Sequence, residues 1–81
     1  MECVLEKAKI TTTEFEEIEN ISSSLDCQKE CQNVQKCLSW SYGPQCLIME
    51  MDINFNNIAN DEEWTSGPRY CPCEYFNIFK S

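Results

Sequence analysis

The sequence predicts a small disulfide-rich α+β domain, and three observations support this fold class. The chain has 81 residues, of which seven are cysteines and none is histidine. A chain this short buries little apolar surface, so cysteines at this density indicate a disulfide framework formed in an oxidising, secreted environment. One stretch has helical periodicity, and a later stretch alternates as a strand does. No repeat or linker divides the chain, so residues 1–81 are expected to form a single module.

The N-terminal third gives weak signals before a helix. Residues 3–5 are apolar enough for a short strand, whereas residues 6–24 are polar and acidic without a strand or helix period, so we expect a loop there. A helix is predicted to follow and to end near Lys36. Ser24 is its expected N-cap, because a serine oxygen there accepts a hydrogen bond from an otherwise unpaired N–H group.

The predicted helix limits how its cysteines can pair. Cys27 and Cys31 lie at positions i and i+4, on one face with Val34. Their Cβ atoms would be about 5–6 Å apart, too far for a disulfide, so each must bond to another element. Cys71 and Cys73, two residues apart in an extended segment, are a poor pair for the same reason. Geometry leaves the remaining pairings open.

A β-hairpin is predicted after the helix. In residues 37–42, Trp40 and Tyr42 alternate with serines, as expected of a half-buried strand. Residues 43–45 supply a turn, and residues 46–49 return as the partner strand.

The last third is predicted to be a loop and a closing strand. Residues 52–63 are acidic and rich in asparagine, and Gly67 and Pro68 follow as a chain breaker. Residues 70–79 are aromatic enough to form the last strand.

A calcium site is an alternative for the Asn-rich loop. Oxygen donors occupy the first, third, fifth and last of its twelve positions, as in an EF-hand; they are Asp52, Asn54, Asn56 and Glu63. The preceding strand and the Gly-Pro breaker leave no room for the two flanking helices. We therefore expect a solvated loop, with no metal site and no cofactor.

Charge excludes several partners and activities. Lys and Arg together number 6 against 14 for Asp and Glu, which gives a net charge of -8. Neutralising phosphates requires clustered positive charge, so nucleic acid is not an expected partner. No apolar run approaches the roughly 20 residues that span a membrane. Without histidine, Ser-His and Cys-His catalysis is excluded, and we expect no enzyme activity.

The order of cysteines and aromatic residues resembles the PAN/apple family. Three segments carry the resemblance: Cys27-x3-Cys31-x5-Cys37-x2-Trp40-Ser41-Tyr42, Cys46-Leu47-Ile48, and Ser66-Gly67-Pro68-Arg69-Tyr70-Cys71. With Cys3 as the opening cysteine, it covers residues 3–73. The resemblance implies an antiparallel sheet curled around one helix. It also implies three disulfides, which are Cys3–Cys71, Cys27–Cys46 and Cys31–Cys37.

Cys73 departs from the six-cysteine pattern of this family. The pattern leaves Cys73 unpaired. Three alternatives stay open: a free thiol, a last bridge that uses Cys73 in place of Cys71, and an intermolecular disulfide that would link a dimer.

The resemblance implies a non-catalytic adhesion or recognition module. Some family members belong to adhesins that apicomplexan parasites release from micronemes to attach to host cells. We expect a secreted, extracellular module that binds a host-cell protein or a cell-surface glycan, released from a microneme if the source is such a parasite. Protein assembly, in which the acidic module docks onto a basic partner subunit or a neighbouring module, is the alternative.

A glycan site needs an exposed aromatic ring beside polar groups. The candidates for ligand contact are Tyr42, Trp64, Arg69 and Tyr70. A structural role competes with this interpretation, because Trp40 and Trp64 stand where the family packs its core, and Tyr42 shares a strand face with Trp40.

Overall fold

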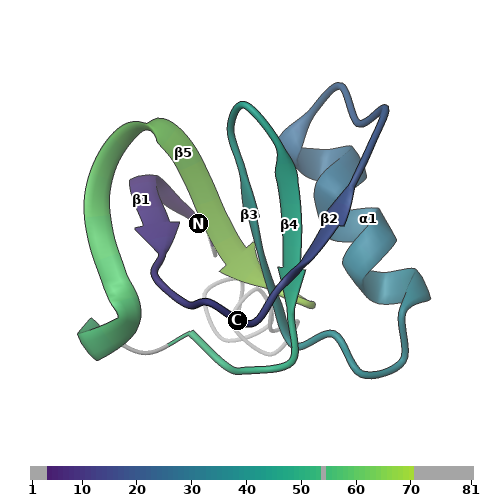
Figure 1. Ribbon diagram of the computed structural model, residues 1–81. Helices are drawn as coiled ribbons and strands as arrows, with labels where there is room; N and C mark the ends of the chain where they lie inside the picture. Colours follow the sequence, from purple (N-terminus) through teal and green to yellow (C-terminus); the bar gives the residue numbers. More distant parts are fainter. Residues whose placement is uncertain (1–3, 54, 71–81) are drawn as a thin grey trace, which may run out of the picture.

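The computed structural model describes residues 4–53 and 55–70, and within them the chain forms one five-stranded antiparallel sheet and one α-helix. The elements are β1 (Leu5–Ile10), β2 (Glu16–Ile18), α1 (Ser24–Asn33), β3 (Ser39–Tyr42), β4 (Cys46–Met49), the 3-10 helix η1 (Phe55–Asn57) and β5 (Ile58–Pro68). The strand order is β1-β5-β3-β4-β2, α1 packs on β3 and β4, and β5 arcs beside β1 (Figure 1). This architecture confirms the predicted α+β class.

The start of α1 follows from its serines. Ser23 is the N-cap, and its hydroxyl accepts a hydrogen bond from the backbone N–H of Asp26 at 3.1 Å. Asp26 also stands in the first turn, where the helix dipole favours a negative charge. The prediction placed the cap one residue later, at Ser24, because either of the adjacent serines has the required oxygen. The helix ends at Asn33, earlier than predicted, since Val34 is already extended.

Two disulfides attach α1 to the sheet. Cys27 is bonded to Cys46 at the start of β4, and Cys31 is bonded to Cys37, shortly before β3. These are the two pairs that the family resemblance implies for the helix cysteines. The expected Cys3–Cys71 bridge lies outside the described residues, as does Cys73.

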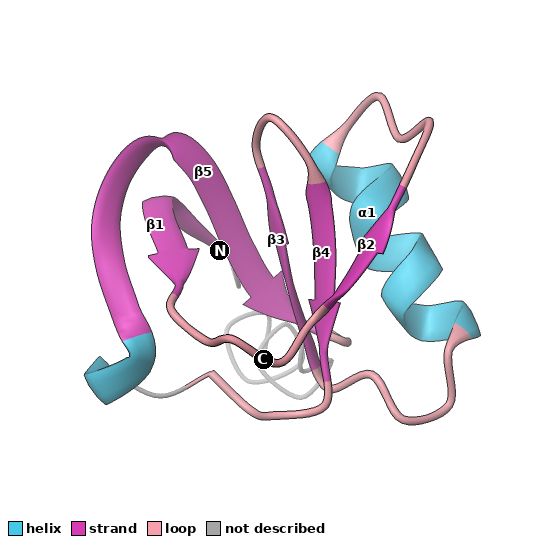
Figure 2. Ribbon diagram, viewed as in Figure 1, coloured by secondary structure: helices cyan, strands magenta, loops and turns pink. Residues whose placement is uncertain are grey.

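The core formed by residues 4–53 and 55–70 has two parts, one on each face of the central strands. On the helix side, a cluster is formed by Cys27, Cys31, Cys37, Trp40, Cys46 and Ile48. On the other side, a second cluster is formed by Ile10, Leu47, Met49 and Trp64. Alternate residues of β4 point to opposite faces, so this strand is buried on both sides. Figure 2 shows how the helix and the curved strands enclose it.

The serines of β3 are buried, which corrects the prediction of a half-exposed strand. Ser39 and Ser41 have 0 % exposure, because Ile10 of β1 covers Ser41 and the segment after β4 reaches Ser39, whose Oγ donates to the carbonyl of Met51. Their neighbours satisfy the hydroxyls. Ser41 Oγ lies 2.6 Å from Ser66 Oγ and accepts a hydrogen bond from the N–H of Ile10, and Ser66 Oγ donates to the carbonyl of Ala8. Buried hydroxyls thereby join three strands.

Two segments predicted as loops contain strands. Residues 6–24 include most of β1 and all of β2, and half of residues 52–63 belongs to β5. The sequence of these strands lacks a regular alternation of apolar and polar residues because the β1–β5 pairing is irregular. Its register shifts after Glu6, and Lys7 has a left-handed backbone (φ 58°). A shift of this kind breaks the alternation that identifies a strand. β5 is the last strand along the described chain, and the closing strand expected at residues 70–79 lies, except for Tyr70, outside the described residues.

Each of the two glycines of the chain packs against one of its two tryptophans. A Cβ at Gly67 would lie 2.7 Å from the ring of Trp40, and a Cβ at Gly43 would lie 2.8 Å from the ring of Trp64. Trp40 cannot give way easily, because its indole N–H donates to the carbonyl of Pro68 at 2.9 Å. Both glycines are therefore needed for close packing of a ring on backbone.

Gly67→Ala is expected to lower the free energy of unfolding by about 1–3 kcal/mol, because the added methyl group overpacks the site against Trp40. Urea denaturation followed by tryptophan fluorescence, with disulfides intact, measures the change. Asn60→Ala, at an exposed position of the same strand, is the control and is expected to change stability by less than about 0.5 kcal/mol. A Gly67→Ala domain as stable as the parent would contradict the steric argument.

Removing Cys27–Cys46 by replacing both residues with alanine is expected to cost about 3 kcal/mol, since the bridge closes a loop across a separation of 19 residues. Removing Cys31–Cys37, with a separation of 6, is expected to cost about 2 kcal/mol. The same denaturation experiment compares the two variants. A larger loss of stability on removing Cys31–Cys37 than on removing Cys27–Cys46 would show that loop length does not determine the effect of these bridges.

Candidate functional site

The structure does not bring the four predicted ligand-binding residues together. Trp64 is buried (6 % exposed) in the second cluster, and its ring packs against Gly43 and lies 4.6 Å from the ammonium group of Lys9. Tyr42 packs against the other cluster, on the helix side, and its hydroxyl donates to the carbonyl of Ile21. Both residues therefore contribute to the packed interior, which is the role that competed with ligand contact.

Arg69 binds the C-terminal end of α1. Its guanidinium donates to the carbonyls of Gln32 (2.9 Å) and Gln35 (2.7 Å). The last turn of α1 has no basic residue of its own, so Arg69 supplies the positive charge that the negative end of the helix dipole favours. In return, the amide of Gln32 donates to the carbonyl of Arg69. The exit of β5 is thus tied to the helix end.

Tyr70 keeps an exposed ring. It is 59 % exposed, and the guanidinium carbon of Arg69 lies 5.4 Å from its ring centroid. Among the four predicted residues, Tyr70 alone presents an open aromatic surface. It stands near the Ser39 end of β3, whereas Tyr42 ends that strand at the other side, so the two do not share a site.

The calcium-loop pattern is not folded as an EF-hand. Asp52 precedes η1, Asn56 lies within it, and Glu63 lies in the sixth position of β5, where the chain is extended. Asn54 is outside the described residues. Six residues of strand span about 16–20 Å, which carries Glu63 away from the start of the loop. Among the residues that the structure describes, no group of three or more acidic, Cys or His side chains could hold a metal ion.

A groove of about 430 Å³ lies at the end of β4, between residues 12–16 and residues 48–51. It exists because the chain must cross the sheet: β1 and β2 are consecutive in sequence but stand at opposite edges. β2 pairs with β4 only from Glu16 onward, and before it the chain departs toward β1, where the N–H of Thr11 donates to the carbonyl of Asn57. The two segments therefore diverge and leave the groove between them.

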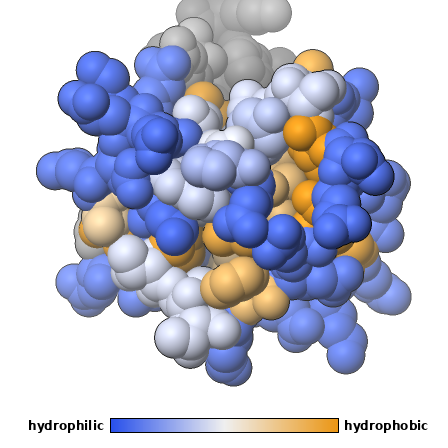
Figure 3. Space-filling view, turned by 45° about the horizontal axis from the view of Figure 1, so that its top comes forward, coloured by the Kyte–Doolittle hydropathy of each residue, from blue (hydrophilic) through white to orange (hydrophobic). Residues whose placement is uncertain are grey.

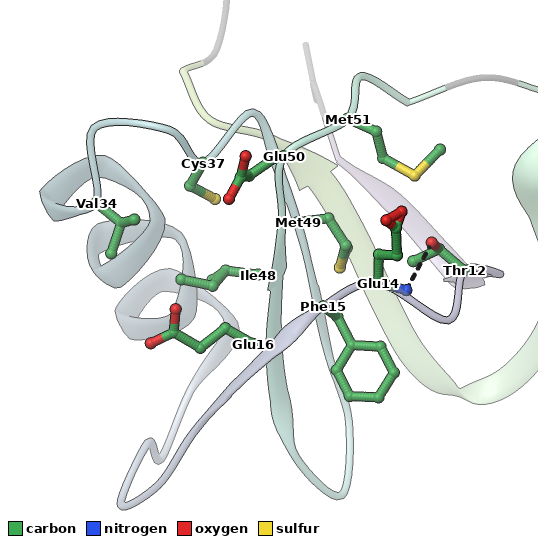
Figure 4. A pocket seen from close by; sticks show the side chains of 10 residues that line it. All are labelled: Thr12, Glu14, Phe15, Glu16, Val34, Cys37, Ile48, Met49, Glu50 and Met51. Atoms are coloured by element: carbon green, nitrogen blue, oxygen red, sulfur yellow. Dashed lines mark hydrogen bonds between the residues drawn. The ribbon is translucent and has the colours of Figure 1, made fainter.

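The groove combines an apolar lining with carboxylates. The apolar residues are Phe15, Val34, Ile48, Met49 and Met51, and the carboxylates belong to Glu14, Glu16 and Glu50. In Figure 4, Val34, Ile48 and Glu16 lie on one side of β4, and Met49, Met51 and Phe15 lie on the other. Phe15 is 47 % exposed, and within the described part of the chain none of the three carboxylates forms an ion pair.

Few large apolar side chains are exposed among the described residues. The large apolar side chains that are exposed among the described residues are Phe15, Leu25, Leu38 and Tyr70. Figure 3 shows one face on which apolar side chains reach the surface as small patches between hydrophilic ones. Phe15 differs from the other exposed apolar residues because it borders this groove.

Sequence reasoning missed this groove. The sequence predicts a loop at residues 12–16 and a hairpin strand at residues 46–49, and it gives no reason to place the two segments side by side. A signal was nonetheless present: glutamate alternates with apolar residues in Glu14-Phe15-Glu16 and again in Met49-Glu50-Met51. Only the sheet order brings the two short runs together.

Arg69→Ala is expected to lower the free energy of unfolding by about 1–3 kcal/mol, because two charge-assisted hydrogen bonds to the end of α1 are lost. Arg69→Lys should recover only part of this, since an ammonium group lacks the planar fork that reaches both carbonyls. Lys36→Ala, at an exposed position near the same helix end, is the control. Denaturation of all three variants measures the effect, and an unaltered Arg69→Ala domain would refute the capping role.

Within the described residues, no helix is long and apolar enough to cross a membrane.

A family model described as PAN domain matches residues 3–71, a span that contains six of the seven cysteines. Comparisons with curated proteins and with solved structures found no match. PAN domains are generally modules that bind proteins or carbohydrates without catalysing a reaction, and disulfide-rich members are typical of extracellular proteins. Because the match covers most of its length, the chain belongs to the PAN domain family.

Proposed function

We propose that this PAN domain is an extracellular adhesion module that attaches to a protein on the surface of a host cell through the groove at the end of β4. The observation that carries the proposal is the apolar lining of the groove, with the ring of Phe15 half exposed beside carboxylates that no described residue neutralises. Protein recognition sites commonly place aromatic and methionine side chains at their centre and polar groups at their rim.

The contacts around Tyr70 give less support to a glycan as the ligand. Sugar recognition combines a ring that stacks on the sugar with nearby donors and acceptors for its hydroxyl groups. Beside Tyr70, the guanidinium of Arg69 is already committed to the end of α1. In the groove, the lining consists mainly of apolar side chains and carboxylates, with a single hydroxyl side chain, Thr12. The carboxylates could accept hydrogen bonds from sugar hydroxyls, but the lining offers Thr12 as its single side-chain donor, so a protein surface with an apolar side chain is the better match.

The proposal includes secretion of the module, and its disulfides are the reason. Two disulfides hold α1 in place, and such bonds persist in oxidising compartments. In an apicomplexan parasite, release from micronemes would deliver the module to the host-cell surface. The same groove would also serve docking onto a partner subunit, and a dimer linked through Cys73 stays a prediction because that residue is not described.

Cell-binding measurements test the proposal. The disulfide-intact domain, biotinylated and multimerised on labelled streptavidin, is expected to bind cultured mammalian cells and to lose this binding after the cells are treated with trypsin. Phe15→Ser should reduce binding about tenfold, because an exposed ring in a groove is a favourable interface anchor. Leu25→Ser is the matched control: Leu25 is 57 % exposed on α1, outside the groove, and its replacement should leave binding unchanged.

Three outcomes would count against this function. Absence of cell binding would reject adhesion, and equal losses for Phe15→Ser and Leu25→Ser would reject the groove as the site. Binding that survives trypsin, disappears after glycosidase treatment and requires Tyr70 would instead assign the ligand as a glycan.

A further inference from the structure

We infer that the occupant of the groove is a polypeptide segment in which an apolar side chain is flanked by Lys or Arg residues. This inference rests on the proposed function, which names the groove as the binding site but not the chemistry of its ligand. The apolar lining and the three carboxylates determine that chemistry together, and neither alone would do so.

The apolar lining on one side of β4, formed by Phe15, Met49 and Met51, suits one large side chain rather than a flat surface. Ligand clefts typically measure about 300–1,000 Å³, and the groove, at about 430 Å³, lies at the lower end of this range. Met49 is nearly fully buried at its base, Met51 is half-buried, and Phe15 is open to solvent. Methionine side chains adapt to different shapes. The groove is therefore expected to accept Leu, Ile, Met or Phe without strict preference.

The carboxylates decide the sign of the flanking charges. Glu14, Glu16 and Glu50 are exposed in the free domain, and their oxygens are hydrated at little cost. A ligand that covers them removes water, and a carboxylate that loses water without gaining a positive partner is strongly destabilised. A neutral apolar segment would therefore leave this cost uncompensated, and an acidic segment would add repulsion.

The charge of the chain also argues against a second copy as the occupant. Each copy carries a net charge of -8, so bringing two copies together is opposed by long-range repulsion. Two of the cations in the described residues are already engaged, since Lys9 lies over Trp64 and Arg69 binds the end of α1. The positive charges are thus expected to come from a different chain.

Selection from a random nonapeptide library displayed on phage tests the inference with a defined probe. The parent domain should enrich peptides in which an apolar residue lies between Lys or Arg residues. The variant Glu14→Gln/Glu16→Gln/Glu50→Gln should lose this enrichment. Its matched control is Glu6→Gln/Glu62→Gln/Glu63→Gln, which changes the net charge equally but at exposed positions of β1 and β5, at the opposite edge of the sheet from β2.

A synthetic copy of an enriched peptide gives the quantitative readout. Its affinity should fall about tenfold in the groove variant, as expected for the loss of three exposed ion pairs, and less than about twofold in the control variant. NMR spectra of the isotope-labelled domain should show peptide-induced shifts at Phe15, Val34 and Met51. Binding should weaken as salt is raised from about 0.05 to 0.5 M.

Several results would overturn the inference. These are a library that yields no enriched sequence, enriched peptides without Lys or Arg, equal losses in both variants, and shifts outside the groove. The peptide measurements involve no cells, so they separate the two proposals. Peptide binding in the groove without cell attachment would reject only the adhesion function, whereas Phe15-dependent cell attachment without selection for Lys or Arg would reject only this inference.

Discussion

The disulfide between Cys27 and Cys46 is the contact on which the rest of the structure depends, because it attaches α1 directly to a central strand, whereas the second bridge reaches only the segment before β3. α1 has ten residues, and those it buries are two cysteines and a glutamine. Isolated helices of this length are marginal in water, and α1 has no apolar stripe to bury. Four of the six residues in the cluster beneath it are cysteines. Covalent bonds thus replace much of the hydrocarbon that a larger domain would use.

The position of α1 then determines two further features. Its C-terminal end meets the exit of β5. There the guanidinium of Arg69 donates to the carbonyls of Gln32 and Gln35, and the side-chain amide of Gln32 donates to the carbonyl of Arg69. The residue after the helix, Val34, and the bridged Cys37 form part of the groove lining. The groove is therefore built partly on a cross-linked support and partly on the crossing segment at residues 12–16. Binding sites often combine a rigid scaffold with connecting segments in this way.

Local patterns predicted some of this structure, and contacts between distant segments decided the rest. The helix and the β3–β4 hairpin carry their own periodicity, and the burial of Trp40 follows from it. β1 and β5 were missed because the register shift near Lys7 breaks the alternation of both strands. The burial of Ser41 and the capping role of Arg69 depend on partners more than 20 residues away. Residues so far apart in sequence leave no local pattern that marks them as partners. The two segments that form the groove are separated in the same way, so the sequence did not predict it.

The pairing of β1 with β5 also has a mechanical consequence. Leu5 stands opposite Ser66, so the described chain enters and leaves the sheet at neighbouring points. Where a module of this kind is pulled by segments attached to both ends, the load falls on this strand pair in the unzipping direction, and its hydrogen bonds break one after another. The Cys3–Cys71 bond that the family resemblance implies would join a residue just before β1 to a residue just after β5. Tension would then pass through a covalent link and would bypass the groove at the far edge of the sheet.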